Sequence, residues 1–368
     1  MSTIINISTA LPPYKHNQGE IGEFMADLYS YSGQKRERLL ALYRSSGIQA
    51  RYSFIPDYSL PENERTFFPK TKDLEPFPNI EYRMQFFKQY APGLCMEAIN
   101  NCLKDTVSVH EITHLITVSC TGVSAPGLDI EIVRLLGLNE YINRTSVNFM
   151  GCYAALHALK QADYICKCHA DAVVLIICVE LCTIHFQKTD VPDNIIANLL
   201  FADGAAASLI VADDYAEKNN FRGLALKKFC SQITFSGRND MAWEPTSSGF
   251  LMTLSSYVPE LIEKGIKDLF QKTLFQAGID EKRIKHWAIH PGGKKILSTI
   301  QKELKLGKDD MECANSVLSD YGNMSSPTFL FVLKSLWEQR MDVRRPEITF
   351  GVAFGPGLTM ESVIIENV

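Results

Sequence analysis

The stretch SVNFMGCYAALHALKQADYICKCHADAVVLIICVEL, residues 146–181, decides the fold class of this chain. Its first five residues have the composition of a β-strand, residues 152–167 have the apolar spacing of a helix, and residues 172–181 are a nearly continuous apolar run. Gly151 permits the sharp turn that joins the first strand to the helix. An apolar strand without polar alternation is typical of a sheet that helices cover on both faces, so the sequence predicts an α/β fold.

The alternation of strands and helices extends in both directions from this stretch. We predict further buried strands at residues 113–120 and 205–214, and a helix over residues 82–104. The apolar spacing over residues 20–46 predicts an amphipathic helix. Residues 54–80 contain five prolines and predict an irregular surface segment.

The second half of the chain repeats the same pattern. It predicts, in order, helix 257–276, strand 286–290, helices at 293–305 and 327–338, and a final strand–turn–strand around Gly355–Pro356–Gly357. Gly-containing turns feed an apolar strand in both halves, which indicates a faint internal duplication. Since a polar stretch at residues 213–220 separates the halves, we expect one unit over residues 1–213 and another over residues 214–368.

Composition and charge exclude several classes of protein. The chain of 368 residues has a formal net charge of −5 and 46% hydrophobic residues, which are values of a globular protein. The acidic balance argues against nucleic acid as a partner, because such binding normally needs a concentrated basic surface. No apolar run approaches the roughly 18 residues of a membrane span, and the first residues lack the basic start of a secretory signal. We therefore expect a soluble, cytoplasmic protein.

The ten cysteines do not form a recognisable framework. Disulfides are rare in intracellular proteins of this size, and the close pair Cys166 and Cys168 lacks the second pair that would complete a metal site. Most of the cysteines are expected to be buried as small hydrophobic residues. Because no GxGxxG element occurs either, the sequence predicts no metal, nicotinamide or flavin cofactor.

Three residues on sharp turns could carry chemistry. Cys152 stands where the strand gives way to the helix, and the start of a helix favours the thiolate form of a cysteine. His290 ends an apolar strand before Pro-Gly-Gly, and Asn323 lies in a Gly-Asn turn shortly before Pro327. Each alone has an ordinary structural explanation, as a buried thiol, a structural histidine or a capping asparagine. Together they form a more specific pattern than any one of them.

A thiol, an imidazole and an amide suit decarboxylative carbon–carbon bond formation. A thiolate can accept an acyl group from a thioester, which divides the transfer into two steps. If a second thioester such as malonyl-CoA then loses CO₂, its enolate oxygen needs hydrogen-bond donors, and His290 and Asn323 can supply them. In a cysteine protease, by contrast, the histidine acts as a base and the asparagine only orients it.

At these residues the sequence resembles the type III polyketide synthases, the chalcone synthase-like family on the thiolase fold. The resemblance runs over most of the chain and is carried by VNFMGCYAALHAL around Cys152, LLFADGAAASLIV around Phe201, WAIHPGGKKIL around His290, SDYGNMSSPTFLFVL around Asn323, and the terminal GVAFGPGLTMESVII. It implies a five-layered αβαβα fold made of two related halves. It also implies a homodimer that uses CoA thioesters and needs no carrier protein.

The resemblance assigns roles to individual residues. Cys152 would carry the acyl group, and His290 would hold the sulfur of Cys152 as a thiolate. His290 and Asn323 together would bind the thioester carbonyl during loading and decarboxylation. Phe201 matches the aromatic gatekeeper between the CoA tunnel and the reaction cavity. The product would be extended by malonyl-CoA and closed to a resorcinol, pyrone or phloroglucinol type of ring. The remaining site residues that it implies are Met252, His185, Trp243, Ser325 and Ala125 for the cavity, and Arg38 and Arg44 for CoA.

Several of these positions depart from the common family pattern. Met252 stands where a second phenylalanine gatekeeper is usual, and His185 and Trp243 stand where smaller residues are usual. These larger side chains predict a reduced or redirected cavity, which argues against plant-like tetraketide chalcone chemistry. Ala125 replaces a methionine that commonly reaches into the partner's cavity.

Other functions remain possible from the sequence. A ketoacyl-ACP synthase III shares thiolase ancestry and a Cys/His/Asn trio, although HPGG, GNMSS and FGPGLT speak against it. The spacing of Cys152 and His290 also fits a papain-like protease, but the signature around its cysteine is absent. A catalytically inactive acyl-CoA-binding scaffold is a non-enzymatic alternative, which the loss of one of the trio would favour, and none is lost.

Overall fold

The computed structural model describes residues 2–342 and 345–368 and is built around a large mixed sheet. The order across the sheet is β11–β12–β13–β8–β1–β7–β6–β4–β5. The bounds of these strands are Ser2–Ala10 (β1), His114–Ser119 (β4), Asn143–Asn148 (β5), Val173–Leu181 (β6), Asp203–Ala212 (β7), Leu224–Ile233 (β8), Ile284–Ile289 (β11), Ile348–Gly355 (β12) and Thr359–Asn367 (β13). Two small antiparallel pairs stand apart, namely β2 (Tyr14–Asn17) with β3 (Ala50–Ser53) and β9 (Met241–Thr246) with β10 (Gly249–Leu254).

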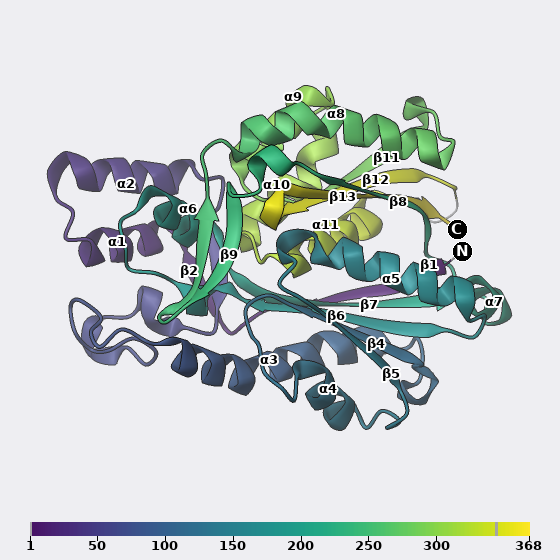
Figure 1. The fold of residues 1–368 in the computed structure, drawn as a ribbon, viewed down its shortest axis with the longest axis horizontal. Helices are drawn as coiled ribbons and strands as arrows, with labels where there is room; N and C mark the ends of the chain where they lie inside the picture. Colours follow the sequence, from purple (N-terminus) through teal and green to yellow (C-terminus); the bar gives the residue numbers. More distant parts are fainter. Residues whose placement is uncertain (1, 343–344) are drawn as a thin grey trace.

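The elements form five layers (Figure 1). Helices α3 (Ile80–Leu103) and α4 (Leu128–Leu136) cover the outer face of the N-terminal strands, and α8 (Val258–Ala277) and α9 (Lys294–Glu303) cover the C-terminal strands. Between the two groups of strands lie α5 (Ala154–Cys168) and α11 (Ser326–Gln339), which contact each other. The predicted α/β class and αβαβα order are confirmed.

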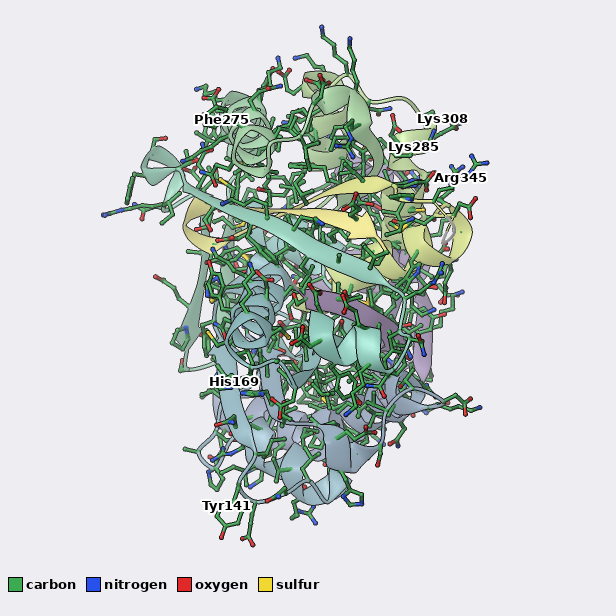
Figure 2. All side chains as sticks on the ribbon, turned by 90° about the vertical axis from the view of Figure 1, so that its right-hand side faces the viewer. Tyr141, His169, Phe275, Lys285, Lys308 and Arg345 are labelled. Atoms are coloured by element: carbon green, nitrogen blue, oxygen red, sulfur yellow. The ribbon has the colours of Figure 1, made fainter. Side chains whose placement is uncertain are left out.

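The two halves of the chain meet in two places. Helices α5 and α11 form a common middle layer, and strand β1 joins the two groups of strands. β1 pairs with β7 along its length, but it pairs with β8 only through residues 2–4 and 224–226, so the ladder between the halves is short. Figure 2 shows side chains filling the space between the layers, with Phe275 and Tyr141 projecting from opposite ends of the molecule.

Among the described residues, no helix combines the length and the apolar character needed to cross a membrane.

Most predicted elements are confirmed within a few residues, but the prediction of one continuous helix over residues 20–46 is wrong. The structure has two helices there, α1 (Gln18–Leu28) and α2 (Gly33–Ser45). Ser30 and Gly33 adopt the left-handed backbone with φ of 52°, which interrupts the helix. The apolar spacing continues through the break because both helices pack against the same core. The pattern alone therefore could not reveal the interruption.

Several elements had no prediction. They are the strands β1, β2, β3 and β8, the hairpin β9–β10, and the helices α4, α6 (Pro192–Leu200), α7 (Asp213–Lys218) and α10 (Glu312–Tyr321). The irregular character predicted for residues 54–80 is confirmed, since the segment contains only two short 3₁₀ turns, Pro56–Ser59 and Glu62–Glu64. Its placement at the surface is wrong in part, because Ile55, Phe68 and Leu74 are buried in the core.

Candidate active site

Cys152 lies in a 3₁₀ turn, Gly151–Tyr153, between β5 and α5. Gly151 has φ of 73°, and a Cβ atom there would lie 2.3 Å from Cδ of Pro356. No other residue fits without moving the turn between β12 and β13, so glycine is required at this position. The turn buries Cys152 and packs it against the loop that follows β12.

His290 and Asn323 reach the same region from other elements. The backbone N–H of His290 donates to Val352 O at 2.9 Å, which extends the pairing of β11 with β12 and fixes the residue before the Gly-rich turn. Asn323 follows α10, and its backbone bonds to Leu200 O and Ala202 N at 3.0 and 2.9 Å. These two bonds hold Asn323 beside Phe201 in an isolated bridge.

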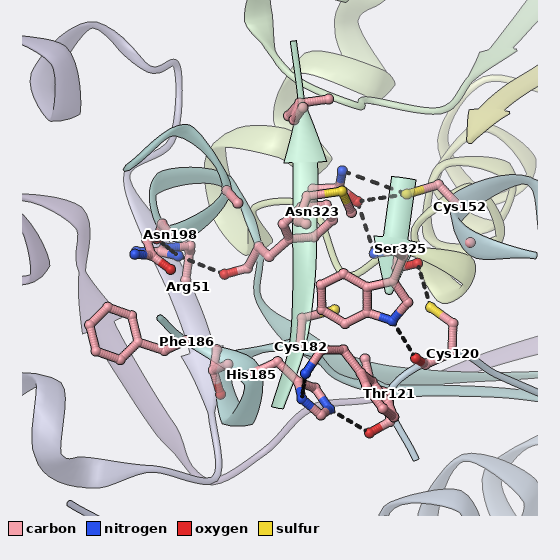
Figure 3. A pocket seen from close by; sticks show the side chains of 18 of the residues that line it. Arg51, Cys120, Thr121, Cys152, Cys182, His185, Phe186, Asn198, Asn323 and Ser325 are labelled. Atoms are coloured by element: carbon pink, nitrogen blue, oxygen red, sulfur yellow. Dashed lines mark hydrogen bonds between the residues drawn. The ribbon is translucent and has the colours of Figure 1, made fainter. Parts of the chain in front are cut away.

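The Asn323 amide faces the sulfur of Cys152 (Figure 3). Oδ1 of Asn323 accepts from the backbone N–H of Ser325 at 2.8 Å, and Nδ2 lies 3.9 Å from Sγ of Cys152. This bond fixes the amide so that its N–H₂ donors are left for other partners. Ser325 has φ of 59°, a strained conformation for a residue with a side chain, and such strain is concentrated at functional sites.

The imidazole of His290 is buried and unpaired. Only 1% of the residue is exposed, and neither ring nitrogen has a hydrogen-bond partner within the described part of the chain. Leaving a buried polar group unpaired costs about 1–3 kcal/mol. Because native proteins rarely tolerate this cost without a function, the two nitrogens are available for a substrate or for the thiol.

Burial shifts the pKa values of both groups away from their charged forms. It raises the pKa of the Cys152 thiol to about 11, although hydrogen bonds from Ser325 and Asn323 oppose the shift. Burial also lowers the pKa of His290 to about 3. Burial of the thiol therefore opposes the thiolate that the helix start was expected to favour. A thiolate becomes favourable here only if its proton passes to His290, so that the two charges compensate.

This argument predicts a coupled pH profile. In the His290→Ala variant no imidazole can take the proton and burial keeps the pKa of Cys152 raised, so we expect alkylation by iodoacetamide to rise only in alkaline solution. In the wild type we expect proton transfer to His290, which would make alkylation at neutral pH at least about tenfold faster. Peptide mass mapping of Cys152 alkylation from pH 6 to pH 10 measures both profiles, and coincident profiles would contradict the pairing of the two residues.

The trio lines one cavity of about 70 Å³. The structure brings five further predicted residues to the same cavity, namely Phe201, Met252, His185, Trp243 and Ser325. Ala125 does not line it, and it lies in an exposed loop. Arg38 and Arg44 are exposed on α2 and do not line it either, and Arg44 lies 3.8 Å from Glu37.

Three aromatic side chains form a wall along one side of the cavity. His185 stacks on Phe250 with a distance of 4.3 Å between ring centroids, and Trp243 meets both rings edge-on. Nε2 of His185 donates to Thr121 O at 2.7 Å while Nδ1 accepts from Phe250 N–H at 3.0 Å. The indole of Trp243 donates to the carbonyl of Cys120 at 2.7 Å (Figure 3). Since all these polar atoms are paired, the wall is rigid and presents ring carbons to the cavity.

Sequence reasoning missed two buried charged residues at the site. Arg51 lines the cavity and donates to the carbonyls of Asn198 and Phe201 at 2.7 and 2.6 Å. These two hydrogen bonds fix the chain just before and just after the end of α6. Glu180 is fully buried and accepts from Cys120 N–H and Thr121 Oγ1, and burial raises its pKa. The signal for Glu180 was available, because a single acidic residue ends the apolar strand at residues 172–181.

A second cavity of about 560 Å³ adjoins the first. The two share Leu254, Gly292 and Ile296, so the second cavity leads towards the trio. Its lining includes Lys294 and Lys295 at the start of α9. Across residues 2–342 and 345–368, no group of three or more His, Cys, Asp or Glu side chains could hold a metal ion.

Comparison with protein-family models matches both halves of the chain. Residues 1–214 match the N-terminal domain of chalcone and stilbene synthases, and residues 227–368 match their C-terminal domain.

Individual relatives cover the whole chain. It is 29% identical over 367 residues to the alpha-pyrone synthesis polyketide synthase-like Pks18 of Mycobacterium tuberculosis, covering 100% of this chain and 91% of that protein. It is 28% identical to type III polyketide synthase C of Arabidopsis thaliana, with 100% and 95% covered. It is also 29% identical to probable polyketide synthase 1 of Dictyostelium discoideum, but it spans only 11% of that protein's length.

Solved structures share the fold. The crystal structure of PKS-I from the brown alga Ectocarpus siliculosus superimposes with a TM-score of 0.91 at 26% identity, covering 100% of this chain and 98% of that one. The C-terminal type III polyketide synthase domain of Steely1, a type I/III hybrid from Dictyostelium, gives a TM-score of 0.91 at 28% identity, with 100% and 99% covered.

Proposed function

Since this chain belongs to the chalcone and stilbene synthase family of type III polyketide synthases, we propose that it loads an acyl group from an acyl-CoA onto Cys152 and extends it with malonyl-CoA. One observation carries the proposal. Both ring nitrogens of His290 lack a hydrogen-bond partner, and His290 lines the same buried cavity as the Cys152 thiol and the Asn323 amide.

The loading step uses Cys152 and His290. The thiol passes its proton to the imidazole, and the sulfur attacks the carbonyl carbon of the acyl-CoA, forming a new carbon–sulfur bond. The bond to the CoA sulfur breaks, and the CoA thiolate leaves with the proton from His290. Asn323 Nδ2 donates to the carbonyl oxygen as negative charge develops on it.

The extension step uses His290 and Asn323 as donors. The carbon–carboxylate bond of malonyl-CoA breaks and releases CO₂, which leaves the electron pair as an enolate on the thioester. The two donors stabilise the enolate oxygen, and the apolar ring of Phe201 keeps water from the carbanion. The carbanion then attacks the acyl group on Cys152, and the sulfur leaves as the thiolate. The product is a β-ketoacyl-CoA that can be extended again.

The mouth of the second cavity suits the phosphates of CoA. Lys294 and Lys295 are exposed at the start of α9, where the unpaired backbone N–H groups and the helix dipole also attract anions. Lys294 Nζ lies 3.2 Å from Ser45 O, so α2 helps to position it. Arg38 and Arg44 also lie on α2, and we propose them only as outer contacts with CoA.

We expect the double variant Lys294→Ala/Lys295→Ala to raise the KM for malonyl-CoA about tenfold, which corresponds to about 1.4 kcal/mol of binding free energy. Added salt should reduce the difference in KM between the wild type and the double variant, because the charges of Lys294 and Lys295 are exposed. Lys302→Ala is the matched control, since Lys302 lies on the same helix and pairs with Glu263 at 2.7 Å. Steady-state kinetics decides, and equal KM values for the two variants would contradict a role at the mouth.

We also propose a homodimer that works in the cytoplasm without a carrier protein. Strand β5 is an edge of the sheet, and apolar side chains are exposed on α4 and in the segments that flank α4 and β5, namely Val123, Ile130, Leu135, Tyr141 and Phe149. A second copy would cover these residues, since large exposed apolar patches are typical of interfaces. We keep residues 1–213 and 214–368 as the two related halves of each subunit. Light scattering on the purified protein tests the dimer, and a monomer would contradict it.

Product analysis tests the proposed function. The purified protein is incubated with malonyl-CoA and acyl-CoA starters, and the products are identified by mass. We expect starters that gain repeated two-carbon units, closed to a resorcinol, pyrone or phloroglucinol type of ring. The similarity to the mycobacterial alpha-pyrone synthesis polyketide synthase-like protein favours a pyrone. A single extension that requires an acyl carrier protein would instead indicate a ketoacyl-ACP synthase III, an alternative that the comparisons do not support.

A further inference from the structure

We propose that Arg51 is a positioning residue for the extension step. It holds Phe201 and Asn323 together as one unit, and this unit keeps the loss of CO₂ coupled to the formation of a carbon–carbon bond. Arg51 acts through the backbone of Phe201 and not on the reacting atoms. The inference rests on the proposed function, because it concerns the same extension step.

The end of helix α6 is bound by groups from three other parts of the chain. A helix leaves its last four carbonyl groups without partners inside the helix. Three of these carbonyls in α6 accept hydrogen bonds from outside it, namely Asn198 from Arg51 at 2.7 Å, Leu199 from Gln18 Nε2 at 2.9 Å and Leu200 from the backbone N–H of Asn323 at 3.0 Å. The positive charge of Arg51 also suits the negative end of the helix dipole. These contacts set the position of Phe201, the residue that follows α6.

Arg51 joins these contacts to one another. Its Nη1 donates to Phe201 O at 2.6 Å as well as to Asn198 O, and its Nε donates to Gln18 Oε1 at 2.9 Å (Figure 3 shows Arg51 beside Asn198). The residue is only 5% exposed, and its hydrogen-bond partners within the described residues include no carboxylate. A buried cation without a carboxylate partner is costly, so its presence beside the cavity favours a role beyond stability.

The stem of Arg51 packs against the residue before Asn323. Gly322 has φ of 70°, and a Cβ atom there would lie 2.9 Å from Cγ of Arg51 and 3.1 Å from Leu200 O. Glycine is required at this position because both the space and the backbone conformation exclude a side chain. Arg51 therefore supports Asn323 through Gly322, while its guanidinium holds Phe201, which is bridged to Asn323.

A loss of this support should change the fate of the enolate. After malonyl-CoA has lost CO₂, the enolate carbon either attacks the acyl group on Cys152 or takes a proton from water, which gives acetyl-CoA. The attack requires Asn323 to hold the enolate near Cys152 and Phe201 to exclude water. A displaced pair favours the proton, so CO₂ is released without a new carbon–carbon bond. The ratio of released CO₂ to incorporated malonyl units therefore reports on the position of the pair.

Arg51→Met tests this inference, because it removes the charge and the donors but keeps an unbranched stem beside Gly322. We expect kcat for product formation to fall at least about tenfold, and KM for malonyl-CoA to change less than about twofold, since uniform binding is unaffected. The released CO₂ per incorporated malonyl unit should rise at least about threefold over the wild type. Labelled malonyl-CoA measures CO₂, and mass spectrometry measures product and acetyl-CoA with a starter other than acetyl-CoA.

Arg51→Lys is the conservative variant and should restore most of the coupling. An ammonium keeps the positive charge and can donate to both carbonyls that Arg51 binds. A general loss of stability lowers the amount of active enzyme but leaves the ratio of released CO₂ to incorporated malonyl units unchanged. Rescue of this ratio by Arg51→Lys therefore separates positioning from stability.

Arg83→Met is the matched control. Arg83 is also a buried arginine that donates to two backbone carbonyls, those of Pro78 and Ile184, but it does not line the cavity. It should keep the wild-type ratio of CO₂ to incorporated malonyl units even if its melting temperature falls. The same ratio in Arg51→Met as in Arg83→Met would overturn the positioning role.

Gln18→Leu decides if Arg51→Met does not fold. It removes the bond to Leu199 O and the acceptor of Arg51 Nε but keeps the buried charge. It should raise the ratio of CO₂ to incorporated malonyl units at least about twofold, and a wild-type ratio would overturn the inference. If the wild type releases no CO₂ and forms no extended product with any starter, the proposed function is wrong. Wild-type extension with an unchanged ratio in the variants rejects the role of Arg51 alone.

Discussion

Cys152→Ala is expected to lower polyketide formation by about a thousandfold or more, measured as extended product per enzyme by mass spectrometry. The variant lacks the atom that holds the acyl group between loading and extension, and loss of a covalent nucleophile has effects of this order or larger. The fold should persist, because alanine differs from cysteine by one small atom and the turn is held by Gly151 and Pro356. The circular dichroism spectrum and the melting temperature check the fold.

Cys168→Ala is the control for Cys152→Ala. Cys168 is an exposed free cysteine at the last residue of the same helix, α5. It should form product at the wild-type rate. Product formation by Cys152→Ala close to that of Cys168→Ala would show that the thiol does not carry the chain.

His290→Ala and Asn323→Ala should each slow the decarboxylation of malonyl-CoA by about 10²–10³, the effect of removing one donor from an oxyanion site. The release of ¹⁴CO₂ from labelled malonyl-CoA measures this step without the need for a starter. His290→Gln should recover part of the rate, since an amide can still donate to the enolate oxygen.

A matched control exists on the same strand. His286 lies on β11, pairs with Glu347 at 2.8 Å and does not line the cavity. His286→Gln should therefore keep the wild-type rate of decarboxylation. If His290→Ala and Asn323→Ala also kept that rate, the proposed pair of donors would be excluded.

The sequence predicted the local frame of the site because that frame depends on short-range rules. Continuous apolar strands between helices predicted the layers, and glycine next to Cys152 predicted a sharp turn that the close approach of Pro356 now explains. His290 at the end of a strand was a candidate for the same reason. The resemblance to a family added that these residues meet, a point that spacing along the chain cannot establish.

Other parts of the site depend on contacts between distant segments. The wall forms because the hairpin β9–β10 brings Trp243 to Cys120 and Phe250 to His185, and no pattern in the sequence indicates this pairing. The contact of α1 with residues 56–59 likewise depends on the break between α1 and α2, which periodicity did not reveal. The sequence also could not show that burial raises the pKa of Cys152, because burial is a property of the folded structure.

Three thiols line the cavity, and only one is proposed to react. Burial raises the pKa values of Cys120 and Cys182 well above their ordinary value, and the nearby carboxyl of Glu180 raises both further. Cys152 is shifted less, to about 11, because Ser325 and Asn323 hydrogen-bond to its sulfur. It also has the strand-to-helix position and the neighbouring Asn323 amide that the other two lack.

The most direct measurement is the site of acylation. The purified protein is mixed with an acyl-CoA starter in the absence of malonyl-CoA, quenched with acid, digested and analysed by peptide mass spectrometry. We predict one acyl group per chain, attached to the peptide that contains Cys152, and none on this peptide in His290→Ala at short reaction times. Acylation of Cys120 or Cys182 in its place, or no acylation with any starter, would contradict the account.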